Sequence, residues 1–315
     1  MISGLNTVSD RFLAALTLIT ARADRALRQI GSGKKLEFAS DQPSDVSRLL
    51  IARGQLEQTL QVTTNLGRAK SEVDTAEQAL QTAVKVLERV ITIGAQGATA
   101  TQTPTQRTII AVEVQAALEQ MVNIAATTVE GRHIFSGDDY RNAPYTVDLT
   151  QPNGVSAYAG SAATREIMHP SGTKFTISHS ADQIFDSPGA SVFAAINNLR
   201  IALQAVPTVP PGDPDYNTQY EAQTAAISAA MVELKKAHDH LSAELSHYGT
   251  IQNRIEEALE TANKLKLRQE IELSEIQDAD IIEAVIQLTE AQTHKEVALA
   301  SHARTAGRSL FDYLG

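Results

Sequence analysis

Eleven positions between Ile227 and Ala262 follow alternating steps of four and three residues, and nearly all of them are apolar. A period of 3.5 residues keeps one stripe of a helix facing a partner helix and favours a left-handed coiled coil. The spacing therefore predicts a long helical rod. The residues that we expect to form its seam are Leu234, Leu241, Leu245, Tyr248, Ile255 and Leu259.

Aromatic and proline residues gather in the middle of the chain. Nine of the 14 aromatic residues lie between Phe135 and Tyr220, and eight of the ten prolines lie between Pro144 and Pro214. The flanks are rich in Ala, Leu, Gln, Glu and Thr instead. This partition predicts a mainly α protein, in which long helical arms at both chain ends flank a small β-rich (α+β) domain inserted in the middle.

The order of the expected elements follows from periodicity and from turn residues. Apolar periodicity predicts helices over residues 5–30, 44–95 and 105–130, whereas short alternating runs such as 173-TKFTIS-178 predict strands and hairpins after Gly131. A further helix is expected over 191–205, before a proline-rich link. The expected division is an N-terminal assembly helix and break at 1–43, long rod helices at 44–130, an outward-facing β-rich insertion at 131–215, a C-terminal rod helix at 216–276 and a C-terminal assembly helix at 277–315.

Both terminal helices carry apolar residues on more than one side. In the first helix Leu13 and Leu18 lie well off the main apolar stripe. Ordering a residue costs about 1–2 kcal/mol, while burying a leucine contributes about 1.5–3 kcal/mol, so a helix pair alone would about break even. We therefore expect both ends to be mobile in the monomer and to fold on assembly. The expected interface residues are Leu5, Phe12, Leu16, Ile19, Ile282, Val285, Leu288, Leu310 and Phe311.

The stretch 31-GSGKK-35 has the residue types of a phosphate-binding loop, but its spacing is wrong. Gly33-Lys34 is followed by lysine rather than by Ser or Thr, and no strand precedes it. Gly31 and Gly33 fit better as the end of a helix, and Pro43 fits the first turn of the next one.

Other sites for chemistry are equally poorly supported. His238 and His240 do not share a helix face, and Asp138-Asp139 lies in an expected turn. The chain has no cysteine and a net charge of −10, which argues against thiolate chemistry and against nucleic acid as a partner. We therefore expect no enzyme, no metal site and no cofactor.

The N-terminal residues lack the basic start and the apolar run of a cleaved secretory signal. No stretch approaches 18 consecutive apolar residues, so no membrane insertion is expected.

Four stretches, in this order, resemble the bacterial flagellin family: 27-LRQIGSGKKLEFASDQPSD-45, 87-LERVITIGAQGATATQT-103, 251-IQNRIEEALETANKL-265 and 276-IQDADIIEAVIQLTEAQ-292. The resemblance covers about residues 1–140 and 230–315. Within the family, 131-GRHIFSG-137 and 309-SLFDYLG-315 are more similar to the junction proteins between hook and filament than to filament flagellins. His133, Ser136 and Gln42 depart from the junction pattern.

The resemblance implies a structural component of the bacterial flagellum, an adaptor that joins hook to filament by polymerising through its terminal helices. It also implies that both chain ends form a long antiparallel coiled-coil rod, and that the middle insertion faces outward and has a small separate core. Its implied partners are other copies of itself, the other hook-associated junction protein, flagellin and an export chaperone at the C-terminal helix. It implies secretion to the flagellum without a cleaved signal. A filament flagellin and a phage or secretion-system helical scaffold are the alternatives.

Overall fold

The computed structural model describes residues 3–36, 43–99 and 101–306. The chain divides into two compact units. Unit 1 comprises Met1–Leu60 and Lys264–Gly315, and unit 2 comprises Gln61–Asn263. Each unit thus has its own packing, although two long helices contribute to both.

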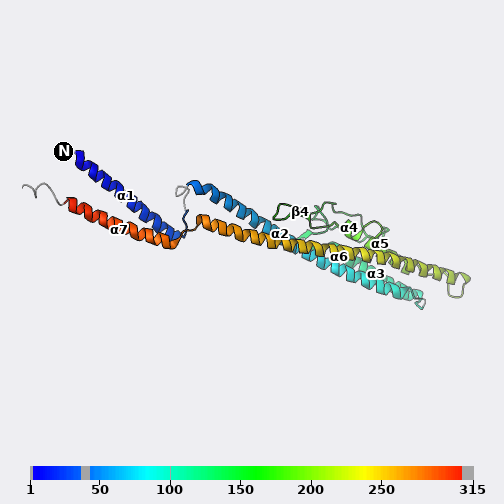
Figure 1. Cartoon of the computed structure of the whole chain (residues 1–315). Helices are drawn as coiled ribbons and strands as arrows, with labels where there is room; N and C mark the ends of the chain where they lie inside the picture. Colours follow the sequence, from blue (N-terminus) through cyan, green and yellow to red (C-terminus); the bar gives the residue numbers. More distant parts are fainter. Residues whose placement is uncertain (1–2, 37–42, 100, 307–315) are drawn as a thin grey trace, which may run out of the picture. The chain divides into compact units, whose positions relative to one another are not determined.

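Helices dominate both units, and the predicted fold class is confirmed (Figure 1). The strands among the described residues form two small two-stranded sheets, both in the middle of the chain. The elements are α1 (Ser3–Ser32), α2 (Pro43–Gly97), α3 (Pro104–Ala125), β1 (Thr128–Val129), β2 (Arg132–His133), β3 (Glu166–Met168), β4 (Lys174–Thr176), α4 (Ala181–Phe185), α5 (Val192–Gln204), α6 (Pro214–Gln277) and α7 (Ile281–Ala306).

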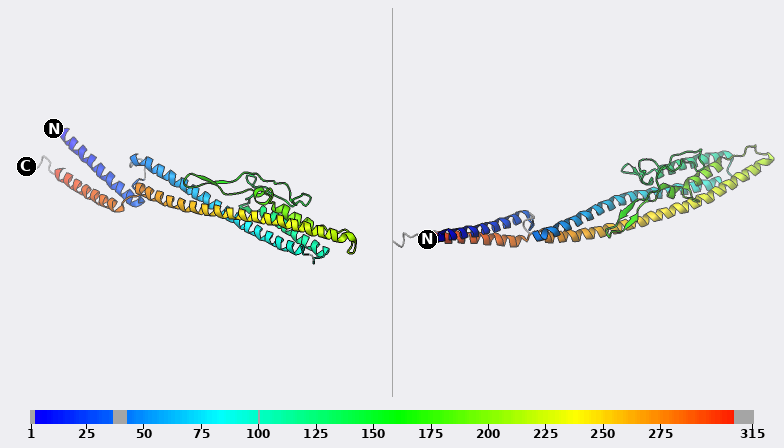
Figure 2. Two further views of the ribbon diagram at one scale, coloured as in Figure 1. Left: turned by 45° about the vertical axis from the view of Figure 1, so that its right-hand side comes forward. Right: turned by 90° about the horizontal axis from the view of Figure 1, so that it is seen from above.

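In unit 1, α1 and α7 lie side by side (Figures 1 and 2). The aromatic ring of Phe12 stacks on His302 across this pair, with a centroid distance of 4.0 Å. Ala26 of α1 and Ala284 and Ala291 of α7 are buried there. The fully buried residues of the two helices are therefore small, although one ring stack also joins the pair.

The breaks after α1 and after α6 are joined by backbone hydrogen bonds. The N–H of Lys35 donates to the carbonyl oxygen of Gln277 at 2.7 Å, and the N–H of Ala279 donates to that of Gly33 at 2.9 Å. Gly33 has a φ of +69°, the left-handed conformation that suits a helix end. Asp280 then caps α7 by accepting hydrogen bonds from the N–H groups of Ile282 and Glu283. Two segments that are far apart in the sequence thus pair in a short antiparallel bridge.

In unit 2, α2 and α6 run antiparallel. Lys70 pairs with Glu256 at 2.6 Å, Asp74 accepts a hydrogen bond from Gln252 at 2.6 Å, and Glu88 lies 3.7 Å from His238. Residue numbers rise along α2 as those of their partners fall along α6. The register is constant over these turns, as expected of an antiparallel helical rod.

The core face of α6 includes only part of the 4,3 pattern. Leu234, Leu241, Tyr248 and Ile255 are buried, whereas Leu245 and Leu259 are partly buried at the margin of the core. Ala230, Ala237, Ile251 and Ala258 are also buried, and they lie one residue before Met231, His238, Gln252 and Leu259 of the pattern. Alanine at most of these positions permits close packing between helices.

The far end of α2 packs closely against α5 and α6. A Cβ atom on Gly94 would lie 2.6 Å from Sδ of Met231 and 2.9 Å from a methyl group of Leu199. Nearby, the buried Arg107 of α3 donates hydrogen bonds to Gln223 and Thr224 of α6. The end of the rod is therefore fixed by close contacts and by a buried polar link.

Helix α3 ends at Ala125, before the expected end at Glu130, because residues 128–133 form the β1–β2 hairpin. Glu130 and Gly131 both have positive φ values, 50° and 75°, as a tight two-residue hairpin turn requires. The hairpin thus begins the middle region before the expected boundary at 131.

The prediction of a separate core for the middle region is wrong. The ring of Phe135 lies edge-on to Tyr248 of α6, with a centroid distance of 6.4 Å, and also contacts Phe185. Phe185 in turn stacks on Phe193 of α5. One continuous hydrophobic cluster contains these aromatic rings and the rod residues. The middle region is therefore built onto the rod.

No helix in the described ranges is both long enough and apolar enough to cross a bilayer.

Candidate assembly surfaces

Helix α1 exposes large apolar side chains in unit 1. Leu13, Leu18 and Leu27 are 55%, 65% and 59% exposed, although leucine is usually buried in folded proteins. The three residues do not form one stripe, which agrees with the pattern expected from the sequence. The contact with α7 leaves these side chains uncovered.

Helix α7 also exposes large apolar side chains. Ile282 is 75% exposed, and Val285, Ile286 and Val297 are also exposed. The buried positions of the helix are the alanines that face α1, Ala284 and Ala291. Most large apolar side chains of α7 are therefore exposed, while its fully buried residues are small.

The expected interface residues divide into two groups. Ile282 and Val285 lie on the exposed surface, whereas Phe12, Leu16, Ile19 and Leu288 are half-buried. Leu5 is described only as part of α1, and Leu310 and Phe311 lie outside the described residues.

The sequence-based list did not include Leu13, Leu18, Leu27 or Val297. The sequence did indicate Leu13 and Leu18, because both lie off the main apolar stripe of the helix.

The parts of α2 and α6 that belong to unit 1 add further exposed apolar groups. Leu50 and Ile51 are exposed on α2, and Leu267 and Ile271 are exposed on α6. The buried residues here are few: Leu36, Leu49, Ala52 and Ile276 form a small cluster. Arg53 donates a hydrogen bond to Gln277 beside it, at 3.0 Å. Large apolar patches on a protein surface mark interaction sites, and this part of unit 1 carries several large apolar side chains on its surface.

The charged groups of the chain form no metal centre among the described residues. The histidines discussed above serve other contacts: His238 lies near Glu88, and His240 Nε2 lies 2.9 Å from the carbonyl oxygen of Gln183. The apolar surfaces of unit 1 are therefore the strongest candidate for function.

Comparison with known proteins identifies the family. The model of the bacterial flagellin N-terminal helical region matches residues 5–139, and that of the C-terminal helical region matches residues 217–314. The chain belongs to the bacterial flagellin family. This family consists of structural proteins of the flagellum, which are extracellular components of that organelle.

Two relatives separate the branches of the flagellin family. The chain is 24% identical to flagellar hook-associated protein 3 of Escherichia coli (strain K12) over 294 residues, which cover 90% of each chain. It is 28% identical to flagellin B of Helicobacter pylori (strain J99) over 145 residues, but these cover 46% of this chain and only 28% of that flagellin. Similarity along nearly the whole length favours the hook-associated branch over filament flagellins.

A solved structure shows the same fold. The crystal structure of flagellar hook-associated protein 3 from Legionella pneumophila matches with a TM-score of 0.63 and 14% sequence identity. The match covers 72% of this flagellin-family chain and 98% of the Legionella chain.

Proposed function

We propose that this protein is an adaptor between the hook and the filament of the bacterial flagellum, and that it polymerises through its terminal helices. The observation that carries the proposal is the exposed apolar surface of α1 and α7, in a chain similar to a hook-associated protein over 90% of its length. Burying a large aliphatic side chain contributes about 1.5–3 kcal/mol, so neighbouring copies that cover these residues would stabilise the assembly.

The chain divides its work accordingly in this proposal. Segments 1–43 and 277–315 hold the subunits together, 44–130 and 216–276 form the rod, and 131–215 faces outward. The rod seam serves within the subunit, because its buried members lie in the core of unit 2.

The proposed partners are other copies of the chain, the second hook-associated junction protein, flagellin and an export chaperone. The chaperone would hold the C-terminal helix, which exposes Ile282, Val285 and Ile286 before assembly. Secretion would proceed through the flagellar export channel without cleavage of a signal.

A deletion strain tests the adaptor role. Loss of a junction protein leaves hooks without filaments, and flagellin that cannot attach accumulates in the medium. Electron microscopy and immunoblotting of the medium measure the two effects, with the strain complemented by the intact gene as control. Filaments of normal length on the deletion strain would contradict the proposal.

A single substitution tests the surface. Ile282→Asp places a charge on a residue that is 75% exposed, so the subunit should fold while incorporation is abolished. Gln292→Asp adds the same charge at another exposed position of α7 and should leave incorporation unchanged. Val285→Asp should behave like Ile282→Asp. Leu288→Asp is a less clean test, because Leu288 is half-buried in the subunit itself.

A filament flagellin is the second candidate, favoured by the 28% identity to flagellin B. Mass spectrometry of sheared flagella separates the two functions, because a filament subunit is the main component and a junction protein is scarce. Abundance comparable to that of the main filament protein would favour the flagellin function.

A further inference from the structure

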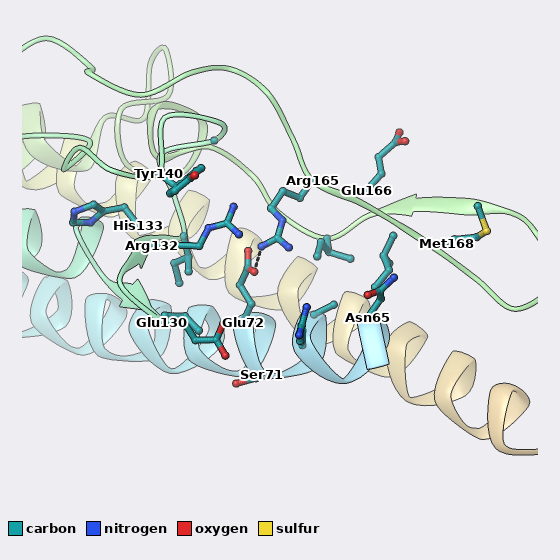
Figure 3. A pocket seen from close by; sticks show the side chains of 17 residues that line it. Asn65, Ser71, Glu72, Glu130, Arg132, His133, Tyr140, Arg165, Glu166 and Met168 are labelled. Atoms are coloured by element: carbon teal, nitrogen blue, oxygen red, sulfur yellow. Dashed lines mark hydrogen bonds and ion pairs between the residues drawn. The ribbon is translucent and has the colours of Figure 1, made fainter. Parts of the chain in front are cut away.

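A pocket of about 380 Å³ lies in unit 2, between α2 and the two small hairpins of the middle region (Figure 3). Asn65, Arg68 and Glu72 line it from α2, Arg132 comes from β2, and Arg165 immediately precedes β3. Pockets of this size suit small molecules.

Three arginines line the pocket, together with the carboxylates of Glu72, Glu130 and Glu166. Arg165 forms an ion pair with Glu72, and Figure 3 shows Arg132 reaching from the other hairpin toward the same carboxylate. Within the described part of the chain, Arg68 and Arg132 have no carboxylate in ion-pair contact. Glu166 also lines the pocket, but it points away from the arginines in Figure 3.

The fold fixes the position of Arg132. It follows directly after the tight turn at Glu130 and Gly131, and its guanidinium lies 4.1 Å from the centroid of the Tyr140 ring. Stacking on a ring orients a guanidinium and leaves its edge N–H groups free to donate hydrogen bonds. Arg132 is exposed, so this geometry does not support the core.

We propose that this pocket binds a small carboxylate ligand, held by Arg132 and Arg165. A guanidinium forms paired hydrogen bonds with a carboxylate, and the negative charge of Glu72 would disfavour a dianion such as phosphate. The remaining lining includes Asn65, Ser71, His133 and Tyr140, which can bond to hydroxyl groups. A carboxylate with several hydroxyl groups, such as an acidic sugar, fits both sets of groups.

Titration of the isotope-labelled full-length protein with D-glucuronate tests the site, and uncharged D-glucose is the control ligand. We expect saturable shifts of the amide signals of residues 129–140 and 165–168 with glucuronate alone. Because a charge-assisted hydrogen bond is lost, Arg132→Gln should weaken binding by about tenfold or more. No saturable shift with glucuronate, or equal shifts with glucose, would overturn the proposal.

Two further variants separate binding from structure. Glu72→Gln removes the competing carboxylate and should tighten glucuronate binding, although it also removes an ion pair of the fold. Arg141→Gln is the matched control, because Arg141 lies 5.9 Å from the same Tyr140 ring but does not line the pocket. A loss of affinity in Arg141→Gln as large as that in Arg132→Gln would also refute the site.

The carboxylate could belong to a free ligand or to an acidic side chain of another copy of the chain. Spectra of the ligand-free protein over a dilution series distinguish the two sources, because only the second makes the same signals depend on protein concentration. All lining residues lie within unit 2. Failure of glucuronate binding would therefore leave the proposed assembly through α1 and α7 untouched, and the converse also holds.

Discussion

Units 1 and 2 are both helical, but they bury opposite kinds of side chain. In unit 2 large residues such as Leu118, Phe193 and Leu241 are fully buried in one continuous cluster. In unit 1 the fully buried residues of α1 and α7 are alanines, while Leu18 and Ile282 are exposed. The same secondary structure therefore rests on a packed core in one unit and on a thin contact in the other.

This difference shows that helix formation and subunit stability are separate matters in this protein. An isolated helix is marginal in water, and most helical stability in proteins comes from packing of an apolar face. Unit 2 has that packing within the subunit. Unit 1 leaves most of its large apolar side chains exposed. Assembly through the chain ends would bury them against other subunits.

The largest expected effect concerns hydrogen exchange of the monomer. Amides of α1 and α7 should exchange roughly a hundredfold or more faster than those in the unit 2 part of α6, because local opening costs little where few large groups are buried. Mass spectrometry of exchanged peptides measures the difference. Equal protection in the two regions would contradict this difference between the units. It would also contradict the expectation that the chain ends order on assembly.

Truncation of a large apolar side chain should cost much more stability in unit 2 than in unit 1. Phe193→Ala removes a buried ring that lies 4.9 Å from the ring of Tyr145 and should lower the free energy of unfolding by about 3–5 kcal/mol. Leu18→Ala should change it by less than about 0.5 kcal/mol, because Leu18 is exposed in the subunit. Urea denaturation followed by circular dichroism measures both values. A large loss in Leu18→Ala would mean that unit 1 buries this side chain in the monomer.

Two glycines of α2 test how closely the helices of unit 2 pack. Gly94→Ala should destabilise unit 2 by about 1–3 kcal/mol, because the new Cβ atom meets Met231 and Leu199. Gly67→Ala is the matched control on the same helix, where no neighbouring atom lies within 4 Å. It should stabilise the protein by roughly 0.5–1 kcal/mol, since alanine favours the helix. Similar effects of the two substitutions on the melting temperature would contradict the close packing at Gly94.

The smallest expected effect is a pH dependence at the contact between the middle region and α6. His179 Nδ1 lies 2.8 Å from Glu244, and the ring of His179 stacks on that of His247 with a centroid distance of 4.3 Å. The hydrogen bond to Glu244 raises the pKa of His179. Burial, together with the nearby charges of His179 and Arg254, lowers the pKa of His247.

The two histidines should therefore affect stability in opposite directions. The contribution of His179 is fully present below its unfolded pKa of about 6.5 and is lost as pH rises through its folded pKa. The contribution of His247 is present above about pH 6.5 and is lost as pH falls through its folded pKa. His179→Gln should thus destabilise unit 2 more at pH 5.5 than at pH 8, and His247→Gln should reduce the loss of stability in acid. Melting temperatures measured over this pH range test the assignment. It would be refuted if the melting temperatures of both variants changed with pH in the same way.

Much of the fold could be predicted from the sequence, because the long helices carry strong local signals. Pro43 begins α2, Gly33 directly follows α1 in a left-handed conformation, and Ser191 precedes α5, all of which local turn and capping chemistry indicates. The exposed residues Ile282 and Val285 were also predicted as surface contacts, and their role in assembly remains a prediction.

The remainder depends on contacts between distant segments. Ala237 and Ala258 are buried in α6, but alanine gives a weak hydrophobic signal, so the 4,3 pattern pointed to the neighbouring residues His238 and Leu259 instead. The buried Arg107 could not be recognised either, because its acceptors lie more than a hundred residues further along the chain. The arginine pocket likewise combines residues from α2 and two hairpins that no local pattern connects.

Two features affect the time at which the protein can fold. They are the antiparallel register of α2 and α6 and the backbone bridge between Gly33 and Ala279. They pair residues that a ribosome makes early with residues that it makes late. Contacts with such long sequence separation form slowly, because the ends of a long loop must first meet. A polypeptide that emerges with its N-terminus first therefore presents its first helix and half of its rod without partners until synthesis is nearly complete.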